Sequence, residues 1–137
     1  MFSMFSKSHR FIKNNRGQAL VEMALILPVL LLIIFGIIEF GRIFNAHITL
    51  THASREGARA GALGGSNTEI VEIVKGSSYP LDIEAENIEI TPGENSRVGG
   101  ETVKVYISSS IDIYTPFINV LLENPFPVDG KTTMRVE

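Results

Sequence analysis

The stretch "RGQALVEMALILPVLLLIIFGIIEF", residues 16–40, decides the fold of this chain. From Met23 to Ile38 every residue is apolar, and the apolar character extends from Ala19 to Phe40 with only two glutamates in between. A helix over these residues would be roughly 33 Å long, enough to cross a hydrocarbon core of about 30 Å. The stretch therefore predicts a single membrane-spanning helix.

The charges around this stretch predict its orientation in the membrane. Four basic residues precede the apolar run that starts at Ala19, and the next basic residue is Arg42; the four are Lys7, Arg10, Lys13 and Arg16. The positive-inside bias then puts the N-terminus in the cytoplasm and the C-terminal part outside. From Gln18 onward the chain has 8 basic and 15 acidic residues. That acidic balance leaves no basic face and argues against nucleic-acid binding.

Two other interpretations of the apolar stretch are weaker. A secretory signal peptide also joins a positive arm to an apolar run, but that run usually has about 7–15 residues and a small-x-small cleavage site follows it closely. Here the arm and the run are long, and no such site follows. A buried core helix of a soluble protein is a further alternative, but the remaining chain offers too little apolar surface to cover it.

Glu22 is unusual because it lies about one turn inside the apolar helix. An ionised carboxylate costs ~2.5–3.5 kcal/mol at the membrane centre and less near the interface, so it calls for a partner or a function. A side chain that snorkels to the headgroups is one explanation. Gly17, five residues earlier and preceded by the basic arm, favours a functional one.

These residues resemble a known family. The basic leader, Gly17 and the following "QALVE" look like the processing site of type IV pilin-like proteins, in which a prepilin peptidase cuts after the glycine. More closely, residues 16–63, which include "ASREGARAGA", resemble the TadE-like family of the tight-adherence (Flp) pilus machinery, and the C-terminal "KTTMRVE" resembles it weakly. Major Flp pilins are far shorter and usually have a tyrosine where Met23 stands, which favours a minor, pseudopilin-like component.

The resemblance implies a processing site at Gly17 and Gln18, and cleavage there would create an ammonium group on Gln18. Glu22 would pair with that group inside a helix bundle and act as a docking charge, because opposite charges offset each other's desolvation. The implied partners are the membrane, a prepilin peptidase, other pilus or pseudopilin subunits and the assembly platform. The implied location is the cytoplasmic (inner) membrane, with entry into an extracellular pilus left open. An uncleaved single-pass protein that acts as an envelope assembly or binding factor is the alternative.

The sequence predicts three parts: a basic leader (1–17), a transmembrane and extended helix (18–65), and a small extracytoplasmic α+β domain (66–137). Beyond the apolar run, a stripe at alternating spacings of three and four continues one helix face; it consists of Ile43, Ala46, Leu50, Ala53, Gly57, Ala60 and Gly64. Its small residues would let another helix approach closely. The candidate packing residues are Ala53, Gly57, Ala60 and Gly61, of which the two glycines form a GxxxG pair.

The C-terminal part predicts a short helix followed by strands. Ser66 and Glu69 form a capping box that opens a helix over 67–75, and Gly76 is expected to end it. Residues 81–90 and 103–114 alternate like strands. "FINVLLEN", enclosed by prolines, is expected to form a short helical turn or loop. Asp129 and Gly130 are expected to turn the chain into a last strand over 131–137. The predicted fold is therefore a membrane-anchored α+β chain, with a small antiparallel sheet packed on the long helix.

No catalytic constellation is found in the sequence. There is no cysteine, and there is no phosphate-binding glycine loop before a lysine. His47 and His52 diverge by about 140° on a helix, which does not suit a metal site. Acidic residues in the outer part, Glu84, Glu86, Glu89 and Asp112, are expected to be solvated. We therefore expect no enzyme activity, cofactor, metal or small-molecule substrate.

Overall fold

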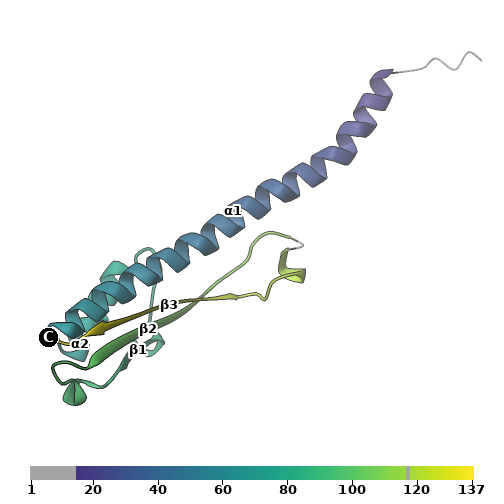
Figure 1. Cartoon of the computed structure of the whole chain (residues 1–137). Coiled ribbons are helices and arrows are strands. Elements are labelled where there is room, and N and C mark those ends of the chain that lie inside the picture. Colours follow the sequence, from purple (N-terminus) through teal and green to yellow (C-terminus); the bar gives the residue numbers. More distant parts are fainter. Residues whose placement is uncertain (1–14, 117) are drawn as a thin grey trace, which may run out of the picture. The chain divides into compact units, whose positions relative to one another are not determined.

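A computed structural model describes residues 15–116 and 118–137 (Figure 1). The chain divides into two compact units, of which the first ends at Ile34 and the second covers Phe35–Glu137. Most of the predicted basic leader, with Lys7, Arg10 and Lys13, lies outside the described residues. We call the second unit the outer domain, after the location predicted for residues 66–137. It includes the helix from Phe35 onward, and so it contains helix residues that precede its predicted start.

The helix α1, Asn15–Ala62, is the longest element. It is long and apolar enough to cross a membrane, and none of its most apolar window is buried within the chain. Leucine, alanine and methionine favour a helix here, and Pro28 is accommodated within it. The prediction of a long apolar helix near the N-terminus is confirmed.

The sheet consists of β1 (Ile88–Thr91), β2 (Thr102–Ile111) and β3 (Phe126–Arg135), all antiparallel, with β2 in the centre. Figure 1 shows the three strands side by side. Along β2, buried Val103, Val105 and Ile107 alternate with more exposed residues, as expected of a strand with one core face. Together with α1 this sheet confirms the predicted α+β fold class. The described part of the chain also contains the short 3-10 helices η1 (Ala85–Asn87), η2 (Glu94–Ser96) and η3 (Ile118–Val120).

The second helix, α2, covers Asn67–Ser77. Its start is as predicted, because the Ser66 hydroxyl accepts a hydrogen bond from the Glu69 backbone N–H at 3.2 Å. Its predicted end is wrong, because α2 runs through Gly76. Ser78 provides the cap instead: its backbone N–H donates to the Val74 carbonyl, and its hydroxyl donates to the Lys75 carbonyl.

The core of the second unit lies between α1, α2 and one face of the sheet. The predicted stripe on α1 supplies Ala46, Leu50 and Ala53, all of which are buried. From the other elements come Ile70, Val74, Ile83, Ile88, Val105, Ile107, Ile111 and Val128. A hydrogen bond between two hydroxyl groups, those of buried Ser54 and half-buried Thr132 at 2.7 Å, joins α1 to β3 at the side of this layer.

Gly130 does not form a turn, and the predicted turn at Asp129 and Gly130 is wrong. Gly130 lies within β3, opposite Ile107 of β2. A Cβ atom on Gly130 would come within 2.7 Å of the Thr51 backbone N and closer still to the Leu50 carbonyl. The glycine is therefore needed where the backbones of α1 and β3 approach each other, and β3 runs straight through it.

The remaining strand boundaries also differ from expectation. Within 81–90 only Ile88–Thr91 is a strand, because residues 85–87 form η1, although Ile83 is still buried in the core. The long strand β2 ends at Ile111 instead of residue 114, and β3 begins at Phe126 instead of residue 131. Within "FINVLLEN", η3 covers Ile118–Val120, in keeping with the predicted helical turn or loop, and Phe117 lies outside the described residues.

Candidate membrane and assembly interface

The predicted processing and docking residues lie together near the start of α1. Gly17 and Gln18 are in helical backbone, and Glu22 lies one turn further on. The Gln18 side-chain amide donates a hydrogen bond to the Glu22 carboxylate at 3.1 Å, with both side chains exposed. The roles of Gly17, Gln18 and Glu22 stay predictions, but the helix does bring the carboxylate within reach of residue 18.

The apolar side chains of the first unit lie on the outside of α1. Leu20, Met23, Leu25 and Ile26 all expose more than half of their surface, and so do others of the run. A continuous exposed apolar surface on this scale marks contact with lipid or with other proteins. This part of α1 therefore needs an apolar environment that residues 15–116 and 118–137 do not supply.

In the second unit the exposed apolar surface continues as a stripe, which we call the outer stripe. It consists of Ile37, Phe40, Phe44 and Ile48, each of which is more than half exposed. Their spacings of three, four and four keep them within one narrow arc of the helix. A hollow of about 300 Å³ beside the stripe is lined by Phe40, Phe44 and Phe126, among others. This stripe was not predicted from the sequence, although the spacing of its residues is visible there.

Glu39 is another residue that the sequence analysis missed. It is 3% exposed, and both of its carboxylate oxygens are occupied. The Arg42 guanidinium lies 2.7 Å from Oε1, and the Thr115 hydroxyl donates to Oε2 at 2.8 Å. Arg42 also donates to the Asp112 carbonyl at 3.4 Å and lies over the Tyr114 ring. The i,i+3 spacing of Glu39 and Arg42 was the available signal for part of this network.

The small residues of the candidate packing set face other elements of the same chain. A Cβ on Gly57 would lie 2.6 Å from Val74 Cγ2, and one on Gly61 would lie 3.1 Å from Ile70 Cδ1. Ala53 is buried, and Ala60 is half-buried beside them. The helix that approaches these positions closely is therefore α2.

Comparison with known families adds an independent finding. A family model described as TadE-like protein matches residues 17–59. Residues 17–59 are thus similar to the TadE-like family. The resemblance inferred from the sequence is confirmed for this segment, which starts at Gly17 and contains both Glu22 and Glu39. Neither the search of curated proteins nor the search of solved structures found a match to the chain.

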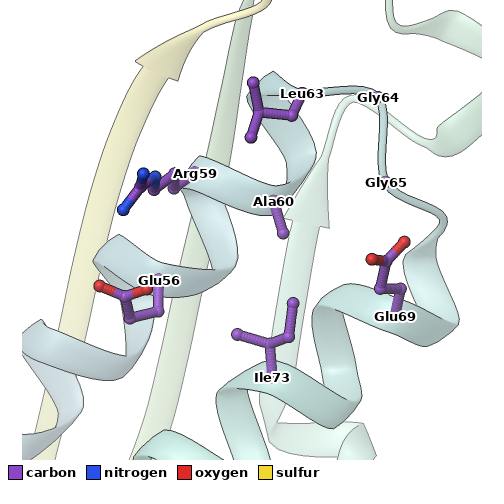
Figure 2. Close-up of a pocket in the computed structure, with 8 residues that line it drawn as sticks. All are labelled: Glu56, Arg59, Ala60, Leu63, Gly64, Gly65, Glu69 and Ile73. Carbon is purple, nitrogen blue, oxygen red and sulfur yellow. The ribbon is translucent and has the colours of Figure 1, made fainter.

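A hollow of about 450 Å³ lies where the TadE-like segment ends, between α1 and α2. Figure 2 shows Ala60 and Ile73 facing each other across the space between the helices, while Arg59 extends away from α2. The charged residues that line the hollow, Glu56, Arg59 and Glu69, therefore do not converge on one point. This hollow does not have the arrangement of a catalytic or ion-binding site.

The other titratable residues considered in the sequence are on the surface. His47 and His52, in the TadE-like segment, are exposed, and so are Glu84, Glu86 and Glu89. Within residues 15–116 and 118–137, no group of three or more histidine or acidic side chains could hold a metal ion. The features that call for a partner are thus the apolar surface of α1 and the charged residues at its start.

Proposed function

We propose that this chain is a membrane-anchored minor pilin or pseudopilin that takes part in the assembly of tight-adherence (Flp, type IVb) pili for surface attachment. The TadE-like match carries this proposal, because it begins at Gly17 and covers the exposed apolar part of α1. The family suggests involvement in pilus assembly. The exposed apolar surface of α1 supports it, since such a helix can stay in the membrane or pack with helices of other subunits.

Processing by a prepilin peptidase between Gly17 and Gln18 is part of the proposal. The sequence puts a basic arm before this bond, which would hold it at the anionic cytoplasmic surface. The bond lies in helical backbone, so the first turn of α1 has to open before a protease can bind it in an extended form. Cleavage would leave an ammonium group on Gln18, one turn from the Glu22 carboxylate.

The outer stripe gives the proposed assembly a second contact surface. Phe40, Phe44 and Ile48 extend the apolar surface of α1 beyond the apolar run and are not covered by the chain's own sheet. Large apolar side chains at i and i+4 are the usual anchors of a helix that packs in a groove or against another helix. Neighbouring subunits would therefore contact both the apolar run and this stripe.

Intact mass of the membrane-extracted protein tests the proposal. In cells that contain the peptidase, we expect a product that begins at Gln18, and in cells without it the full chain. Gly17→Leu should block this maturation while membrane insertion continues. Gly41→Leu is the matched control, because it makes the same change in α1 at a position with open space around it. Equal maturation of both variants would contradict the processing step.

A second candidate function is an uncleaved single-pass protein that serves as an envelope assembly or binding factor. One observation favours it: the Gln18 amide already donates to Glu22, so the carboxylate has a partner without cleavage. The same mass measurement separates the two. A full-length mass in cells with an active peptidase would support the uncleaved protein.

A further inference from the structure

The connection between β2 and β3, residues 112–125, forms a closed loop, which we call the β2–β3 loop. Its base is held by Asn124, whose side-chain amide accepts from the Ile113 N–H at 3.1 Å and donates to the Ile113 carbonyl at 3.2 Å. Between these two residues runs "YTPFINVLLE", in which Glu123 carries the single charge. Figure 1 shows this connection reaching past the ends of the strands.

The loop is fixed to α1 where the apolar run of the helix ends. Thr115 donates to the buried Glu39 carboxylate, and Tyr114 stacks with Arg42 at 4.8 Å from the ring centroid. Further along the loop, Ile118 Cδ1 lies 4.0 Å from the position of a Cβ on Gly36. Gly36 belongs to the apolar run, one turn before Glu39. The tip of the loop is therefore level with the last apolar turn of the helix.

The side chains at this level are apolar and exposed. Val120 is 82% exposed and Leu121 is 85% exposed, while Ile118, which lies next to Gly36 of the helix, is buried. Ile37, Ile38 and Phe40 of α1 are also more than half exposed, so the loop tip continues the apolar surface of the helix end. Tyrosine and arginine side chains, here Tyr114 and Arg42, are typical of the boundary between membrane and water.

We propose that the β2–β3 loop lies in the membrane–water boundary at the C-terminal end of the apolar run, with Val120 and Leu121 inserted among the lipid chains beside α1. The lipid surface is the partner because the loop is anchored to the end of the candidate membrane span and carries no charge from Ile113 to Leu122. Asp112 and Glu123, at the loop base, stay with the headgroups. The inference needs α1 to span the membrane but goes beyond the proposed function, because neither cleavage nor pilus assembly enters it.

Tryptophan fluorescence of the full chain in vesicles tests this proposal. The sequence contains no tryptophan, so Leu121→Trp introduces a single reporter. We expect its emission to shift to shorter wavelength on reconstitution and to be quenched by spin-labelled phospholipids. Tyr79→Trp is the matched control, because Tyr79 is equally exposed, at 84%, but lies in the outer domain after α2. The emission of Tyr79→Trp should be quenched by acrylamide in water. The lipid quencher should reduce it several-fold less than it reduces the emission of Leu121→Trp.

A third variant, Ile33→Trp within the apolar run, gives the response of a residue in the hydrocarbon core. Lipid quenching of Leu121→Trp well above that of Tyr79→Trp supports the proposal, and Val120→Trp should repeat it. Quenching no greater than that of Tyr79→Trp would overturn it. Blue-shifted emission that the lipid quencher does not reach would also overturn it and assign the loop to a protein contact. Failure of Ile33→Trp itself to be quenched would overturn the spanning helix and the loop proposal together.

Discussion

Gly130 and Glu39 show how single residues fix the sheet and its loop on the long helix. At Gly130 the absence of a side chain lets the backbone of β3 approach the backbone of α1 at Leu50 and Thr51. At Glu39 a buried carboxylate binds groups from two elements, Arg42 of α1 and Thr115 of the β2–β3 loop. Gly130 acts by leaving room for the helix backbone, and Glu39 acts by binding an arginine and a hydroxyl group. We expect that a similar residue would not replace either of them.

Gly130→Ala should destabilise the outer domain by ~1–3 kcal/mol, because an added methyl group meets backbone atoms that cannot rotate away. Urea unfolding of the detergent-solubilised chain, followed by circular dichroism, measures the effect. Gly76→Ala is the control: Gly76 lies inside α2 with open space around it, and this substitution should stabilise by about 0.5–1 kcal/mol. Similar midpoints for the two variants would show that α1 and β3 are not in close contact at Gly130.

Thr115→Val keeps the shape of the side chain but removes the hydroxyl that donates to Glu39. The buried carboxylate oxygen then loses a partner, so we expect a loss of ~1–3 kcal/mol and faster amide hydrogen exchange in the β2–β3 loop. Thr133→Val is the control, because Thr133 is exposed on β3 and should change stability by less than about 0.5 kcal/mol. Unchanged exchange in the loop would mean that the Glu39–Thr115 bond does not hold it.

At the scale of elements, the periodicity of apolar residues predicted which helix face and which strand face are buried, but not where β3 begins. The three- and four-residue spacing gave the inner face of α1, and strict alternation gave β2. The start of β3 at Phe126 could not be predicted, because Pro125, Pro127 and Asp129-Gly130 are residues typical of turns. Whether a glycine turns the chain or lets two backbones meet depends on what lies opposite, and a single sequence does not contain that information.

Glu22→Gln belongs to the first turns of α1, where it removes a charge and keeps the side chain's size. Membrane insertion should be unchanged or slightly better, and cleavage after Gly17 should continue. Association with other pilus components should fail, because the Gln18 ammonium would enter a helix bundle without its counter-charge. Co-purification of detergent-solubilised complexes and counts of surface pili measure this.

The control for that experiment is Glu56→Gln, which makes the same change on α1 at a half-buried position in the outer domain. It should leave both co-purification and piliation as in the unaltered chain. If Glu22→Gln matures, assembles and supports pili equally well, Glu22 has no docking role and is an interfacial residue tolerated by nearby water.

For the whole molecule, the sequence predicted the candidate membrane span and the TadE-like resemblance of residues 17–59, but only part of the exposed apolar surface. Residues 16–63 carried the resemblance, and the family model matches nearly the same residues. The Glu39 network was not predicted because Thr115 is 76 residues away in the chain. The role of Gly57 and Gly61 depended on α2, whose packing partner no local pattern identifies.

The orientation in the membrane is a prediction for the whole chain and rests on the basic residues before the apolar run. A reporter that works only outside the cytoplasm, joined after Glu137, should be active. A flexible linker is needed, because the Glu137 N–H donates to the Ala62 carbonyl at the end of α1. Activity of a cytoplasm-only reporter at the same position would reverse the orientation and exclude a role in pilus assembly outside the cell.

The contacts between α1 and the strands follow the helix from one end of the outer domain to the other. In order along α1, Gly36 faces Ile118, Leu50 faces Gly130, Gly61 faces Val103, and Ala62 binds Glu137. The sheet and its loop thus support the helix segment from Phe40 to Ala62, which is roughly 33 Å long, along its whole length. Because Gly36 lies against Ile118 of the β2–β3 loop and the Ala62 carbonyl binds the Glu137 N–H, a rotation of this part of α1 about its own axis would have to carry the loop and the sheet with it.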